Sequence, residues 1–139
     1  MQSRTVSTLS TGLVLICGAL LFPMLVNAGE ADVVAAKATK TGENTYRFDV
    51  TVAHKDTGWD HYANVWQVIG PDGVTIVERV LAHPHVNEQP FTRSLSGVTI
   101  PPDITGVTLR AGDLVHAFGG AELRIELPVE AGQSVTVSN

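Results

Sequence analysis

The stretch YRFDVTV, residues 46–52, alternates apolar and polar side chains without interruption. Successive side chains of a strand point to opposite faces of a sheet, so this period of two is typical of a strand with one buried face. The stretch ELRIEL, residues 122–127, repeats the pattern near the other end of the chain. No segment carries the apolar stripe of an amphipathic helix. The sequence therefore predicts an all-β protein.

Seven strands are predicted, and turn residues separate them. They cover residues 33–39, 46–52, 63–69, 74–82, 90–98, 107–116 and 122–127. The tripeptide PDG, residues 71–73, favours a tight hairpin because proline presets one backbone angle and glycine accepts a positive one. Short strands at this spacing predict one antiparallel, immunoglobulin-like β-sandwich over residues 29–128. Residues 129–139 are predicted as a C-terminal tail or one more edge strand through Val135 and Val137.

The first 28 residues have the organisation of a cleavable signal peptide. Arg4 is their only charged residue, residues 13–26 form an apolar run, and VNA at 26–28 favours cleavage after Ala28. The run is shorter than the roughly 20 residues that span a bilayer, so no permanent membrane anchor is expected. Cys17 raises a lipoprotein alternative, although Ile16 precedes it where lipid modification favours a smaller residue. The expected location is periplasmic or secreted.

The predicted mature chain, residues 29–139, is long enough for one domain with a single core. The only cysteine and both methionines lie in the first 28 residues, so packing rather than disulfides must stabilise the domain. Removal of Arg4 changes the net charge from −5 to −6 with histidine neutral. An acidic domain of this kind argues against nucleic acid and anionic membrane surfaces as partners. The sequence leaves the oligomeric state open.

All five histidines fall at or just beyond the ends of predicted strands. Successive strands of an antiparallel sandwich reverse direction, so the connections that carry the histidines all lie at one end of the fold. We call this the histidine end, after His54, His61, His83, His85 and His116. Loops gathered at one end of a sandwich commonly carry binding functions.

A divalent transition metal is the ligand predicted for the histidine end. The tripeptide His83-Pro84-His85 directs both imidazoles to one side of an extended backbone, a spacing that lets them bind one ion. These two residues and His116 are the preferred ligands, with His54 or His61 completing the set. Imidazole nitrogens suit Zn²⁺ or Cu²⁺, whereas the absence of methionine and cysteine disfavours Cu⁺. His54 also continues the inward face of residues 46–52, which indicates a place at the rim of the core.

Aromatic and acidic side chains are predicted to form the rim of a pocket around this site. They are Trp59, Asp60, Tyr62, Glu88 and Phe118. Asp60 is a candidate carboxylate partner for the second nitrogen of His61. The aromatic residues also fit a hydrophobic lid over the sheet ends. Arg93 lies on an apolar face between Phe91 and Leu95, so it is expected to pair with Glu88 or Asp113.

Three classes of function remain open at this point. The preferred class is a non-enzymatic metal-binding protein. The alternative is an interaction module of the cell envelope that binds a protein or glycan through the same loops. A metal-dependent enzyme would need Glu88 or Asp60 as a base. No nucleophile elbow, cysteine nucleophile or phosphate-binding glycine loop is present, so no catalytic residue is predicted.

Residues 32–128 resemble a small immunoglobulin-like or fibronectin-type sandwich in strand number, in the mid-strand Trp66 and in the PDG hairpin. The disulfide-bearing antibody type is not matched, because a cysteine pair is absent. The runs GWDHYANVW, RVLAHPHVNEQPFTRSLSGV and DLVHAFGG also resemble a family of small exported proteins of Gram-negative bacteria. This resemblance implies an exported sandwich and assigns no activity.

Overall fold

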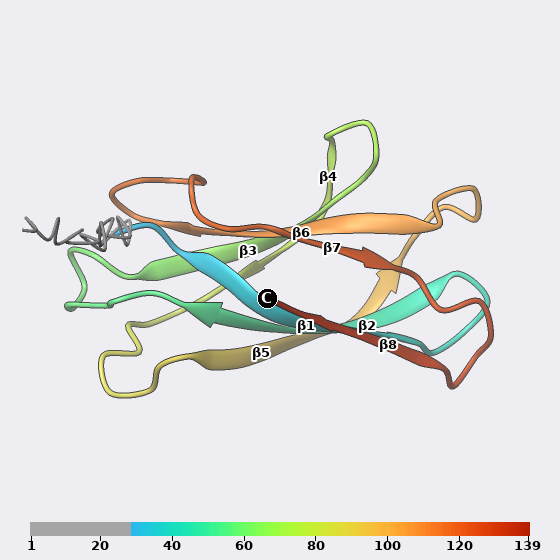
Figure 1. Cartoon of the computed structure of the whole chain (residues 1–139), viewed down its shortest axis with the longest axis horizontal. Helices are drawn as coiled ribbons and strands as arrows, with labels where there is room; N and C mark the ends of the chain where they lie inside the picture. The colour runs from blue at the N-terminus through green and yellow to red at the C-terminus, as the bar shows by residue number, and fades with distance from the viewer. Residues whose placement is uncertain (1–28) are drawn as a thin grey trace, which may run out of the picture.

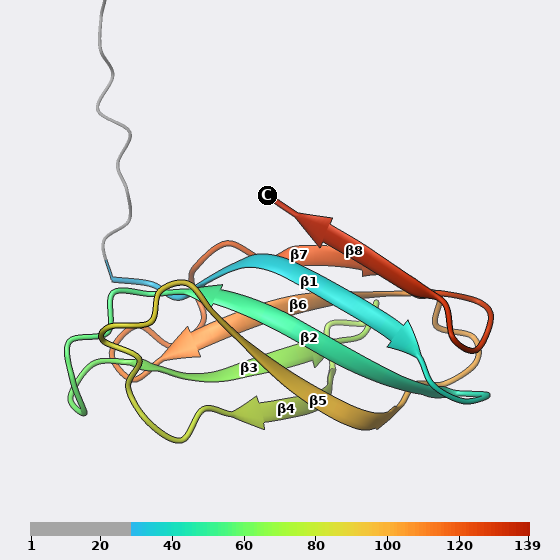
Figure 2. The ribbon, with the colours of Figure 1, turned by 90° about the horizontal axis from the view of Figure 1, so that it is seen from below.

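The computed structural model describes residues 29–139, which form eight β-strands in two sheets. The strands are β1 (Asp32–Lys40), β2 (Thr45–Ala53), β3 (Ala63–Ile69), β4 (Thr75–Val80), β5 (Phe91–Thr99), β6 (Gly106–Asp113), β7 (Leu123–Glu126) and β8 (Ser134–Ser138). One sheet has the order β5-β2-β1-β8 and the other β4-β3-β6-β7, and all neighbours are antiparallel. Figures 1 and 2 show the sheets stacked as two layers. The predicted all-β sandwich is confirmed.

The predicted signal peptide lies outside the described residues. Within residues 29–139, no helix is long and apolar enough to cross a membrane. The C-terminal residues form an edge strand, which was one of the two alternatives for them. This strand, β8, pairs with β1, with Val135 opposite Ala38 and Val137 opposite Ala36. The sandwich therefore extends beyond residue 128. The PDG hairpin between β3 and β4 is also confirmed, and Gly73 has the positive φ of 78° that its turn requires.

The inward faces of the two sheets meet in one apolar core. The apolar positions of YRFDVTV are buried, whereas Arg47 between them is exposed, as the alternation predicts. Trp66 of β3 is fully buried against them and is the core tryptophan of the sandwich. Leu109 of β6 and Ile125 of β7 complete the second sheet's share of the core. No disulfide is needed because packing fills this space.

Three connections gather at one end of the sandwich, on the left in Figure 1. They join β2 to β3, β4 to β5 and β6 to β7, and together they carry all five histidines. The described chain also begins at this end, where the carbonyl oxygen of Gly29 lies close to the rings of His54 and His61. The prediction from strand direction is therefore confirmed: the histidines share one end of the fold.

The β6–β7 connection packs directly on the start of the described chain. A β-carbon on Gly120 would lie 2.0 Å from the carbonyl oxygen of Ala31, and a backbone oxygen cannot rotate away. Gly120→Ala is expected to lower the free energy of unfolding by about 1–3 kcal/mol, measured by chemical denaturation. Gly42→Ala is the control, because its β-carbon meets only side-chain atoms of Thr45 at 3.5 Å. Equal losses in the two variants would contradict this account.

Candidate metal centre

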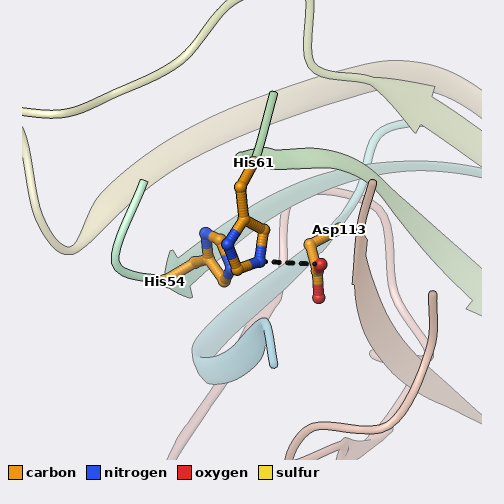
Figure 3. Close-up of side chains that lie close together, drawn as sticks. All are labelled: His54, His61 and Asp113. Carbon is orange, nitrogen blue, oxygen red and sulfur yellow. Dashed lines mark hydrogen bonds and ion pairs between the residues drawn. The ribbon is translucent and has the colours of Figure 1, made fainter. Parts of the chain in front are cut away.

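Three side chains converge at the histidine end: His54 and His61 from the β2–β3 connection, and Asp113 from the end of β6. Strand β3 pairs with β6 so that Ala63 lies opposite Asp113, and His61 stands two residues before Ala63. The Nε2 atom of His61 therefore lies 3.1 Å from Oδ1 of Asp113. His54, directly after β2 of the other sheet, packs its ring edge-on against His61 with 4.8 Å between centroids. One potential ligand atom from each of the three residues lies within 4.8 Å of the other two (Figure 3).

Asp113 also positions a third histidine. Its Oδ1 atom accepts hydrogen bonds from the backbone N–H groups of Val115 and His116, both at 2.9 Å, in the tight turn that follows β6. The same turn brings Nδ1 of His116 to 3.0 Å from Oδ1 and the His116 ring to 5.0 Å from the ring of His61. We call His54, His61, Asp113 and His116 the central cluster.

One oxygen of the Asp113 carboxylate accepts hydrogen bonds, and the other has no hydrogen-bond partner among the described residues. The residue is only 4% exposed, and its Oδ2 atom has no hydrogen-bond partner among the described residues. Burial by itself raises the pKa of Asp113, but the backbone N–H groups of His116 and Val115 and the His116 ring outweigh it and hold the pKa below its usual value. The buried carboxyl group is therefore charged at neutral pH and has a free oxygen for a cation.

Asp56 fixes the orientation of His54. Both side chains are fully buried, and Nδ1 of His54 lies 2.5 Å from Oδ1 of Asp56. The carboxylate also accepts hydrogen bonds from the backbone N–H groups of Ala63 at 3.0 Å and His85 at 2.6 Å. Metal-binding histidines commonly have this arrangement, in which a carboxylate holds one ring nitrogen and leaves the other for the ion.

The other nitrogen of His54 faces a second acceptor. Its Nε2 atom lies 3.1 Å from the carbonyl oxygen of Gly29, and Nε2 of His61 lies 3.2 Å from the same oxygen. A neutral imidazole has one N–H, so His54 cannot donate both to Asp56 and to Gly29. Either a second proton on the ring or a cation beside Nε2 resolves this conflict. The Gly29 oxygen would then be an additional ligand for that cation.

A cavity of about 720 Å³ opens beside the central cluster. Its lining residues come mainly from the start of the described chain, the β2–β3 connection and the segment before β5: Gly29, Glu30, Asp32, Ala53, His54, Lys55, Asp56, Thr57, His61, Val86, Gln89 and Pro90. His54 and His61 thus lie between the buried Asp113 and an open space. An ion bound there can be reached from solvent.

The structure groups the histidines differently from the sequence analysis. His83 and His85 pack against each other, with 4.5 Å between ring centroids, and we call them the outer pair. His116 contacts His61 and Asp113 instead of the outer pair. The reason is the strand order, because β3 stands between β4, which leads to His83, and β6, which leads to His116.

The surroundings of the outer pair are less suited to a cation. A small cavity of about 80 Å³ beside both rings is also lined by Arg79 and Arg93. His85 itself is 4% exposed and stacks on Phe91 with 3.8 Å between centroids. Two guanidinium groups repel a metal ion, whereas the central cluster offers the Asp113 carboxylate. The central cluster is therefore the better candidate for a metal site.

His85 is expected to make folding sensitive to mild acid. Burial first, and then the charge of Arg93, lower the pKa of His85 below its usual value of about 6.5. Its stabilising contribution is therefore complete above pH 6.5 or so and is lost as the pH falls toward the folded-state pKa. His85→Phe keeps the stack on Phe91 and removes the titration, so its unfolding free energy should fall less between pH 7.5 and 5.5. Denaturant titrations check this, and identical slopes for both proteins would refute it.

The residues predicted as a pocket rim lie apart from the lining of the large cavity. Trp59 is 67% exposed and packs edge-on against Tyr62 at 5.8 Å, and Phe118 lies under the guanidinium of Arg110 at 4.3 Å. The carboxylate beside His61 belongs to Asp113, where Asp60 was expected. The predicted ion pair of Arg93 with Glu88 is confirmed, with 3.0 Å between Nη2 and Oε2.

Sequence reasoning missed three members of this site: Gly29, Asp56 and Asp113. Two of them carried a local signal, since Asp56 follows His54 by two residues and Asp113 precedes His116 by three. Acidic residues at these short spacings from a histidine are therefore candidates for its carboxylate partner or for a further metal ligand. Gly29 had no such signal, because its contribution comes from a backbone carbonyl.

The fold and the central cluster define an all-β sandwich protein with a histidine–carboxylate site at one end. Over 106 residues the chain is 35% identical to a protein of the halophilic archaeon Halomicrobium mukohataei described as a "Putative lipoprotein". The match covers 76% of this chain and 52% of that protein, so the chain spans about half the length of this relative. This relative is archaeal, whereas the sequence resemblance pointed to Gram-negative bacteria. No protein-family model and no solved structure matches the chain.

Proposed function

We propose that this protein is an exported binding protein that holds one divalent transition metal ion, Zn²⁺ or Cu²⁺, in the central cluster. His54, His61 and Asp113 are the proposed ligands. The observation that carries the proposal is their convergence, with one potential ligand atom from each residue within 4.8 Å of the others. Imidazole and carboxylate groups are typical ligands of these ions.

Three further features support a metal at this position. Asp56 orients His54 from the side opposite the proposed ion. The buried Oδ2 atom of Asp113 lacks a partner among the described residues, and the Gly29 carbonyl oxygen faces two imidazole nitrogens. Ligand bonds of about 2.0–2.1 Å bring tetrahedral ligand atoms to about 3.4 Å from one another, so binding requires only a small contraction of the cluster.

An envelope location fits this function. The similar archaeal protein is described as a lipoprotein, and residues 1–28 carry the sequence pattern of an export signal. Exported proteins meet metal ions outside the cytoplasm, where an accessible site beside an open cavity is useful for capture. The proposed role is therefore binding or carriage of the ion, without an assigned reaction.

The test is calorimetric titration of residues 29–139, which contain all eight strands and the core, with Zn²⁺ and with Cu²⁺ at neutral pH. The expected result is one bound ion per chain and a higher midpoint of thermal unfolding in its presence, because a ligand specific for the folded state stabilises it. Absence of saturable binding for both ions would overturn the proposal.

A further inference from the structure

We infer that removal of the signal peptide completes the metal site by converting the Gly29 nitrogen into a ligand. This inference rests on the proposed function. Cleavage after Ala28, as the sequence predicts, consumes one water and leaves a carboxylate on Ala28 and a free α-amino group on Gly29. The amide nitrogen of an uncut chain has its lone pair delocalised into the carbonyl and binds metals poorly. The amine has a free lone pair once its extra proton passes to solvent.

Gly29 lies among three imidazoles. Its carbonyl oxygen is 3.1 Å from Nε2 of His54 and 3.2 Å from Nε2 of His61. A β-carbon on Gly29 would lie only 2.7 Å from Cε1 of His116, so the backbone of residue 29 also lies close to this third ring. The backbone of residue 29 is therefore pressed directly onto the central cluster.

Covalent geometry then places the amine near the proposed ion. The nitrogen and carbonyl oxygen of one residue are joined by two backbone atoms, so together they close a five-membered ring on a metal. The oxygen lies close to His54 and His61, and rotation about the Cα–C bond of Gly29 can turn the nitrogen toward the same ion. Gly29 also lines the wall of the large cavity, which gives the amine access to the site.

The completed site would favour Cu²⁺. The amine and the imidazoles of His54 and His61 supply three nitrogen ligands, and Asp113 and the Gly29 carbonyl supply oxygen. Tetragonal sets of nitrogen and oxygen suit Cu²⁺, which also binds such ligands more strongly than Zn²⁺ does. The protein would thus gain its full affinity only after export and cleavage.

The test compares three forms of the protein with Cu²⁺: residues 29–139 with a free Gly29 amine, the same chain acetylated at Gly29, and a chain that retains Ala28 and is acetylated on it. The free form should bind Cu²⁺ at least about tenfold more tightly, since even an outer partner of a metal ligand is commonly worth 10–100-fold in affinity. Its electron paramagnetic resonance spectrum should show three coupled nitrogens, against two in the blocked forms. One extra residue after Asn139 is the control and should change neither value.

Equal affinity and equal nitrogen counts in all three forms would overturn the inference and leave the proposed function standing. Absence of saturable Cu²⁺ and Zn²⁺ binding in every form would overturn both. The intact mass of the protein from the cell envelope gives a separate check. A chain that begins at Gly29 supports the inference, whereas one that begins at a lipid-modified Cys17 overturns it, because Gly29 then has no free amine.

Discussion

Replacing Asp56 by alanine is expected to lower the free energy of unfolding of the metal-free protein by about 3–5 kcal/mol, the usual cost of removing one member of a buried pair. The carboxylate contacts Nδ1 of His54 and accepts hydrogen bonds from the N–H groups of Ala63 and His85. Alanine leaves all three groups buried without an acceptor. Chemical denaturation at pH 7.5 measures the loss.

Asp60→Ala is the matched control, since Asp60 is an exposed carboxylate in the same connection. It should change stability by less than about 0.5 kcal/mol, as surface substitutions usually do. A loss below about 1 kcal/mol in Asp56→Ala would show that the carboxylate does not hold the histidine end together.

Replacing His61 by alanine is expected to weaken Zn²⁺ or Cu²⁺ binding by more than about 100-fold. His61 stands between His54 and His116 and faces Asp113, so its loss opens the middle of the central cluster. Loss of an outer partner of a ligand typically costs 10–100-fold in affinity, and loss of a ligand itself should cost more. Calorimetric titration in competition with a chelator gives the ratio.

His83→Ala is the control for this second experiment. His83 is an exposed histidine at the same end of the fold, and its Nδ1 atom lies 3.0 Å from the carbonyl oxygen of its neighbour Pro84. Its removal should leave metal affinity within about threefold of the original, the scale of a surface change of about 0.5 kcal/mol. The reverse pattern, in which His83→Ala abolishes binding and His61→Ala does not, would place the metal at the outer pair.

The sandwich could be predicted from the sequence because its signals are local. The alternation in YRFDVTV reports directly which side chains are buried, and PDG specifies a hairpin through the backbone angles of two residues. Strand reversal then placed all five histidines at one end. Each of these inferences uses neighbours in sequence and needs no knowledge of which strands are paired.

The grouping of the histidines could not be predicted because it depends on strand order. Pairing of β3 with β6 brings Asp113 to His61, and the position of β3 between β4 and β6 separates His116 from His83 and His85. Ala63 and Asp113 pair although they are far apart in the chain, and hydrophobic periodicity contains no information about such long-range pairing. Gly29 was missed for a related reason, because a backbone carbonyl carries no side-chain signal.

The most direct test of the central claim is the position of the metal itself. Crystals of residues 29–139 grown with Zn²⁺ or Cu²⁺ should give one strong anomalous-scattering peak about 2.0–2.2 Å from a ligand atom of each of His54, His61 and Asp113. A peak between His83 and His85, or no peak on the protein at full metal saturation, would contradict the account.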